Sequence, residues 1–218
     1  MCFILNIETA TKNCSVSLAK NGETIAIKEY AGEGYAHAEK LHVFINDVIN
    51  EANISFTDID AVAVSMGPGS YTGLRIGVSA AKGLCYALSI PLIAIDTLSI
   101  LAHRIKVNEG VIIPMIDARR MEVYSAVFDA GHSMLREIKA EIITEALYSE
   151  AGNNVHLLGD GAGKCKDVLN GNAFTYHDDI QYPSSAEMGV LSYNKYKKSD
   201  TVDVAYFEPF YLKDFIAK

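Results

Sequence analysis

A glycine-rich loop is the part of this sequence whose residues could most readily bind a phosphate group. It lies within SMGPGSYTGLRIGV, residues 65–78, between an apolar run at residues 59–64 and a helix-like run at residues 74–88. A strand, a glycine loop and a helix N-terminus in this order can hold a phosphate on backbone N–H groups. The segment therefore suggests nucleotide binding, and its spacing decides whether a known motif is present.

The spacing matches neither standard nucleotide motif. Counting from Gly67, the Walker A motif places Thr72 where its second glycine should stand, and the glycine that follows is not succeeded by lysine. The G-x-G-x-x-G pattern fails at the same place. A structural turn is expected instead, in which Thr72, or otherwise Ser70, caps the next helix. The residues of this turn are Gly67, Pro68, Gly69, Thr72 and Gly73.

Glu8 and Asp117 are the acidic side chains best placed for chemistry, because each ends an apolar run and begins a polar turn. Their surroundings are FILNIETATKNCSVSLAKNG, residues 3–22, and IIPMIDARRMEVYSAVFDAG, residues 112–131. The distance from the acid to the closing glycine is the same in both segments. Carboxylate oxygens at such turns could hold a hydrated Mg²⁺. The two acids are therefore the candidate cofactor-binding groups.

These two segments belong to a longer internal repeat. Each turn leads into an alternating strand, as in CSVSLA and VYSAVF, and then into a third strand. Further on, each half has an apolar strand that runs into Gly-x-Gly, at residues 61–69 and 155–163. The order of elements predicts a duplicated α/β unit. We place the N-terminal lobe at residues 1–106 and the C-terminal lobe at residues 107–218, with the last segment able to return to the first lobe.

Two predicted helices of the first half are the elements most suited to a protein partner. Residues 37–52 have apolar side chains at helical spacing on one face. Residues 74–88 are apolar or small around most of the circumference, apart from a narrow polar stripe that contains Arg75 and Lys82. A helix of this kind needs neighbours on more than one side. It is either a central helix of its own domain or a helix shared with a second protein.

Composition limits the partners and cofactors. With 27 acidic and 19 basic residues the net charge is −8. This charge argues against binding of a nucleic acid phosphate backbone by this chain without a partner. No apolar run is long enough to span a membrane and no signal peptide is recognisable, so we expect a cytoplasmic protein. The four cysteines are scattered, and His37 and His42 fall on nearly opposite helix faces, so no metal site is expected.

Four segments together resemble the TsaB, or YeaZ, family of bacterial tRNA threonylcarbamoyladenosine biosynthesis. They are ILNIETATKNCSVSL, SMGPGSYTGLRIGVSAAKGL, IDARRMEVYSAVF and FEPFYL. The resemblance implies a two-lobed, duplicated RNase H-like fold of the actin, hexokinase and heat-shock chaperone ATPase superfamily. It also implies a non-catalytic scaffold subunit that pairs with the transferase TsaD, meets TsaE in a larger complex, and reaches tRNA only through that complex.

Comparison with this superfamily also indicates whether Glu8 and Asp117 are expected to take part in nucleotide binding. Its ATP-hydrolysing members cradle phosphates on hairpin turns that contain glycine, whereas the turns ETATKNC and DARRMEV contain none. We therefore expect no cofactor and no catalytic residue. Two alternatives stay open: an ATP-dependent kinase or acyltransferase that uses Glu8 and Asp117, and a nucleotide held at the junction with TsaD. Arg119 and Arg120 are either anion contacts or ordinary surface charge.

The expected contact with TsaD is made by the two helices of the first lobe. The same surface could pair two copies of this chain when TsaD is absent, since a two-fold interface uses one patch twice. The residues expected at this interface are His37, Leu41, Arg75, Val78, Lys82, Cys85 and Tyr86.

Overall fold

The computed structural model describes residues 1–32 and 36–213, which divide into two units. The first unit, here the first lobe, contains residues 1–100 and the segment from Ser184 onward, and the second lobe contains Leu101–Pro183. The sequence predicted a single boundary at residues 106 and 107. In the structure the chain leaves the first lobe slightly earlier, and the described residues after Pro183, 184–213, return to it.

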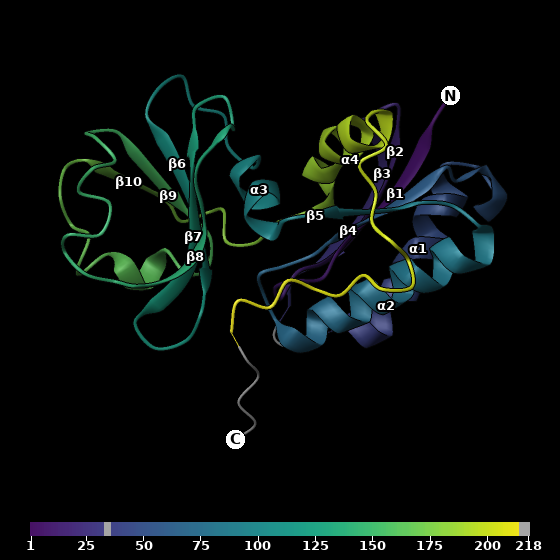
Figure 1. Ribbon diagram of the computed structural model, residues 1–218, viewed down its shortest axis with the longest axis horizontal. Helices are drawn as coiled ribbons and strands as arrows, with labels where there is room; N and C mark the ends of the chain where they lie inside the picture. The colour runs from purple at the N-terminus through teal and green to yellow at the C-terminus, as the bar shows by residue number, and fades with distance from the viewer. Residues whose placement is uncertain (33–35, 214–218) are drawn as a thin grey trace. The chain divides into compact units, whose positions relative to one another are not determined.

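The first lobe is built on a five-stranded mixed sheet with the order β3-β2-β1-β4-β5 (Figure 1). Its first three strands form an antiparallel meander, and the last two run parallel to β1. The strands are β1 (Phe3–Glu8), β2 (Cys14–Lys20), β3 (Glu23–Tyr30), β4 (Ala61–Ser65) and β5 (Leu92–Ile95).

Helices cover both faces of this sheet. Figure 1 shows α1 (His37–Glu51) and α2 (Tyr71–Leu88) on one face and α4 (Met188–Lys197) on the other. Alternate residues of β1 serve the two faces, because Leu5 packs in the α1–α2 layer while Ile4 packs beside α4. Because the sheet is covered on both faces, β1 and β4 are buried along almost their full length.

The second lobe repeats the strand arrangement of the first. Its sheet has the order β10-β9-β6-β7-β8, with β6 antiparallel to β7 and parallel to β9. The strands are β6 (Val111–Asp117), β7 (Glu122–Asp129), β8 (Met134–Ile142), β9 (Val155–Leu158) and β10 (Phe174–His177). The prediction of a duplicated α/β unit is confirmed by these two matching sheets.

The duplication is incomplete in its helices. Residues 143–154, which correspond in order to α1, form turns, and the segment after β9 holds only the short 3₁₀ helix η2 (Gly163–Cys165). The remaining elements are α3 (Thr97–Ala102), η1 (Phe56–Asp58) and η3 (Ser185–Glu187). Because the second lobe lacks counterparts of α1 and α2, the long helices suited to a protein partner lie, among the described residues, in the first lobe.

No helix in residues 1–32 and 36–213 has the length and apolar character to cross a membrane.

Candidate functional site

The glycine loop of the first lobe connects β4 to α2, and Ser70 caps the helix. The Gly73 N–H donates to Ser70 Oγ at 3.3 Å, and Ser70 N–H donates to the Ala10 carbonyl at 2.6 Å. The prediction that Thr72 is the cap is wrong, because Thr72 lies inside the first turn of α2 with an exposed side chain. The capping residue is two positions earlier because the helix begins at Tyr71.

The glycines of this loop are required by the neighbouring β1–β2 turn. A Cβ atom at Gly69 would overlap the Ala10 carbonyl oxygen, and one at Gly73 would overlap the Thr9 carbonyl oxygen. Thr9 Oγ1 donates to the Gly73 carbonyl at 2.8 Å, which ties the turn to the helix. Gly67 has φ of 110° and lies against the carbonyl of residue 210. Close backbone packing accounts for these glycines without any ligand.

Glu8, the first candidate acid, is completely buried at the end of β1. Its Oε1 accepts a hydrogen bond from Ala10 N–H at 2.6 Å. Burial raises the pKa of Glu8 from 4.5 to about 8, with hydrogen bonds from Ala10 and Ser65 opposing the shift. The side chain is therefore mostly protonated at neutral pH. A neutral carboxyl group is a poor ligand for Mg²⁺, which prefers charged carboxylates.

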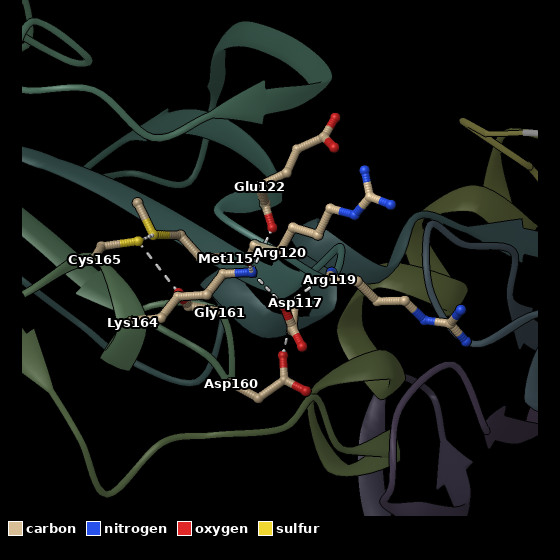
Figure 2. Close-up of polar contacts among 9 residues, drawn as sticks. All are labelled: Met115, Asp117, Arg119, Arg120, Glu122, Asp160, Gly161, Lys164 and Cys165. Atoms are coloured by element: carbon tan, nitrogen blue, oxygen red, sulfur yellow. Dashed lines mark hydrogen bonds and ion pairs between the residues drawn. The ribbon is translucent and has the colours of Figure 1, made fainter.

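Asp117, the second candidate acid, is neutralised by Lys164 (Figure 2). The Lys164 ammonium forms an ion pair with Asp117 and donates to the carbonyls of Arg120 at 2.8 Å and Glu122 at 2.6 Å. Arg119 N–H donates to Asp117 Oδ1 at 3.0 Å, and Asp117 N–H donates to Asp160 Oδ1 at 2.9 Å. The Asp117 carboxylate is thus already engaged by a protein cation and a backbone N–H.

These residues do not fit a Mg-nucleotide. Glu8 is mostly uncharged at neutral pH, and Asp117 already has a cationic partner. Within the described ranges, no three His, Cys, Asp or Glu side chains gather as metal ligands. Lys164 was not predicted from the sequence, although it follows the Gly-x-Gly of the second half. Its partners lie more than 40 positions away, so nothing in the local sequence pointed to them.

The predicted helical interface is only partly at the surface. Its residues His37, Leu41, Val78 and Cys85 are buried inside the first lobe. Leu41, Val78 and Cys85 pack in the apolar layer between the helices and the sheet, and His37 Nε2 lies 2.8 Å from the Thr11 carbonyl. The expectation that these four side chains face outward is wrong, because this side of each helix is the one that covers the sheet.

The polar stripe of α2 instead meets the C-terminal segment of the chain. Figure 1 shows that segment, in yellow, running along α2. Lys82 donates to the carbonyls of Ala205 at 3.1 Å and Phe207 at 2.9 Å, and Arg75 Nε donates to the Tyr211 hydroxyl at 3.3 Å. Arg75 is exposed, as expected.

Tyr86, another predicted interface residue, lies at the surface with 84% of its surface exposed. A groove of about 440 Å³ lies between α1 and α2. Its lining includes His42 and Asn46 from α1 and Ile76, Ser79, Ala80 and Gly83 from α2.

The sequence of this chain matches known proteins along almost its full length. The family model for TsaD, tRNA N6-adenosine threonylcarbamoyltransferase, matches residues 33–218. The tRNA threonylcarbamoyladenosine biosynthesis protein TsaB of Escherichia coli (strain K12) is 30% identical over 224 residues, which cover 98% of this chain and 96% of that protein.

Solved structures agree with these sequence matches. YeaZ from Pseudomonas aeruginosa is 25% identical, with a TM-score of 0.83 over 97% of this chain and 100% of that one. The activator of the 2-hydroxyisocaproyl-CoA dehydratase from Clostridium difficile, solved with bound ADPNP, shares the fold at 12% identity, with a TM-score of 0.51 over 91% of this chain and 96% of that one. The chain therefore belongs to the family described as tRNA N6-adenosine threonylcarbamoyltransferase and, within it, to the TsaB (YeaZ) proteins of tRNA threonylcarbamoyladenosine biosynthesis.

Proposed function

We propose that this chain is a non-catalytic subunit that docks the α1–α2 face of its first lobe onto the transferase TsaD. The observation that carries the proposal is the exposed groove between α1 and α2. Of the described residues that line it, none is Asp, Glu, Lys or Arg. The cores of protein interfaces are depleted in charged residues in the same way.

The groove is shaped to receive a helix. Apart from its chain neighbours and the backbone of its own helix, Gly83 has no atom within 4 Å of the position where a Cβ would stand, and Ser79 is exposed on the same helix. Ile76 and Ala80 are half-buried and form an apolar floor. Small residues at the centre of such a surface allow a partner helix to approach closely, while a few apolar side chains supply the buried area.

Family membership supports TsaD as the partner. This chain matches the family model of the transferase itself, so TsaD is expected to carry a related pair of helices. Two related surfaces can meet about a pseudo-two-fold axis, and two copies of this chain can meet in the same way when TsaD is missing. TsaE would join the resulting complex, and tRNA would reach this chain only within it.

A single substitution in the groove tests the docking face. Gly83→Glu places a charged side chain in open space, so the monomer keeps its fold, and replacing glycine within a helix favours the helix by up to about 1 kcal/mol. We expect the variant to lose its complex with TsaD in size-exclusion chromatography with light scattering. Val190→Glu, at an exposed position of α4 on the other face of the sheet, is the control and should still pair.

The same preparation tests the absence of nucleotide chemistry. Glu8 and Asp117 lack the free charge that Mg-ATP requires, so calorimetric titration of the isolated chain with Mg-ATP should show no binding.

Each of the two tests has an outcome that would contradict the proposal. Pairing of Gly83→Glu with TsaD at wild-type strength would exclude the groove as the docking face. Micromolar binding of Mg-ATP with turnover would favour an ATP-dependent enzyme.

A further inference from the structure

The turn between β6 and β7 holds two adjacent arginines in the left-handed backbone region. Arg119 has φ of 67° and Arg120 has φ of 50°. Hairpin turns that need positive φ favour Asn and Gly, because other side chains are strained there. The chain follows this preference in its β2–β3 turn, where Asn21 has φ of 52° and Gly22 has φ of 92°. Arginine at positions 119 and 120 therefore costs conformational energy that Asn-Gly would avoid.

Hydrogen bonds to Lys164 and Asp117 hold the backbone of this turn. Lys164 donates to the Arg120 carbonyl, and Asp117 accepts a hydrogen bond from the Arg119 N–H. Lys164 also neutralises Asp117, so that carboxylate does not compete for the arginines. Figure 2 shows both arginine side chains extending away from the Lys164–Asp117 cluster. These hydrogen bonds hold the backbone of the turn, and the two cationic side chains extend from it into solvent.

Neither guanidinium has a hydrogen-bond or ion-pair partner in the part of the chain that the structure describes. Arg75 and Arg136, in contrast, bond to Tyr211 and Glu141. Unpaired adjacent arginines are unexpected in a chain with 27 acidic and 19 basic residues, where carboxylates are plentiful. Both side chains are exposed and are free to bind an external anion. Guanidinium groups match the geometry of phosphate oxygens through paired N–H donors.

We propose that the Arg119–Arg120 turn binds phosphate groups of an RNA backbone. The choice of RNA as the polyanion rests on the proposed function. The net charge of −8 makes the contact weak in the isolated chain, so it adds to affinity that a partner subunit supplies. Removing one arginine–phosphate interaction should lower the slope of log affinity against log salt by about one.

The first arm of the test uses the isolated chain and the variant Arg119→Asn/Arg120→Gly, which copies the Asn21–Gly22 turn. Its melting temperature should equal or exceed that of the wild type, which separates binding from folding. In low salt, a short single-stranded RNA should shift the NMR signals of the wild-type turn and leave the variant turn unchanged. Lys106→Gln/Lys139→Gln removes the same charge from exposed positions of the second lobe and should behave as wild type.

The second arm measures tRNA affinity of the complex with TsaD as a function of salt, where the double variant should lose about two units of slope. If no complex forms, the proposed function fails and the first arm still decides the RNA contact. The inference is overturned if RNA leaves the turn signals of the isolated chain unchanged. It is also overturned if the complex forms and binds tRNA with the same salt slope in wild type and variant, or if Mg-ATP shifts the turn signals while RNA does not.

Discussion

The buried carboxyl group of Glu8 should make the stability of this protein fall as pH rises. Burial holds the folded-state pKa of Glu8 at about 8, against 4.5 for the free side chain. Below pH 4.5 both the folded and the unfolded chain carry the proton, so the group has no net effect. Between pH 4.5 and 8 the unfolded chain releases the proton while the folded chain retains it, which lowers the free energy of unfolding.

The magnitude follows from the size of the shift. Each pKa unit corresponds to about 1.36 kcal/mol, so a shift from 4.5 to about 8 costs on the order of 5 kcal/mol at pH 8. That is a large share of the roughly 5–15 kcal/mol that stabilises a typical domain. Glu8→Gln keeps the size of the side chain and an oxygen that can accept from Ala10 N–H, but it does not titrate. The variant should match the wild type near pH 4.5 and exceed it by several kcal/mol at pH 8.

Urea denaturation at constant ionic strength, in steps from about pH 4.5 to about pH 8.5, measures the difference. Glu23→Gln, which removes an exposed carboxylate from the same lobe, is the control and should give a pH-independent offset. A constant difference between wild type and Glu8→Gln across this range would mean that Glu8 is charged in the folded protein, which contradicts a pKa raised by burial.

Two further predictions concern the glycines and the C-terminal segment of the first lobe. Gly73→Ala should destabilise the fold by about 2 kcal/mol or more in urea denaturation, because its Cβ meets the Thr9 carbonyl, whereas Gly83→Ala should be neutral or stabilising. Equal effects of the two changes would contradict this packing. Lys82→Met removes the donor to the carbonyls of residues 205 and 207, so limited proteolysis should cut this segment faster. Unchanged cleavage would show that Lys82 does not anchor it.

The sequence was sufficient to predict the strands and the duplication. Period-2 alternation in CSVSLA and VYSAVF identified β2 and β7, and the equal spacing after Glu8 and Asp117 identified the repeat. These signals are local, since each depends on residues within one hairpin. The same reasoning could not detect that the second lobe lacks a counterpart of α1, because TEALYSEA, residues 144–151, consists largely of residues compatible with a helix.

The sequence was insufficient to orient the helices or to find contacts between distant segments. An apolar helix shows that neighbours exist but not which side faces the sheet, so Leu41 and Val78 were assigned to the wrong surface. The partners of Lys82 and Arg75 lie more than 120 positions further along the chain. Contacts of this kind depend on the course of the whole chain, which no local pattern records.

We propose above that this chain acts through the α1–α2 face of its first lobe. Hydrogen–deuterium exchange of the chain, alone and mixed with TsaD, tests it most directly because every segment is observed at once. On binding TsaD we expect slower exchange in the peptides that cover residues 37–51 and 71–88 and no change in α4. Protection confined to α4 or to the second lobe, or no protection at all in a mixture that forms a complex, would contradict it.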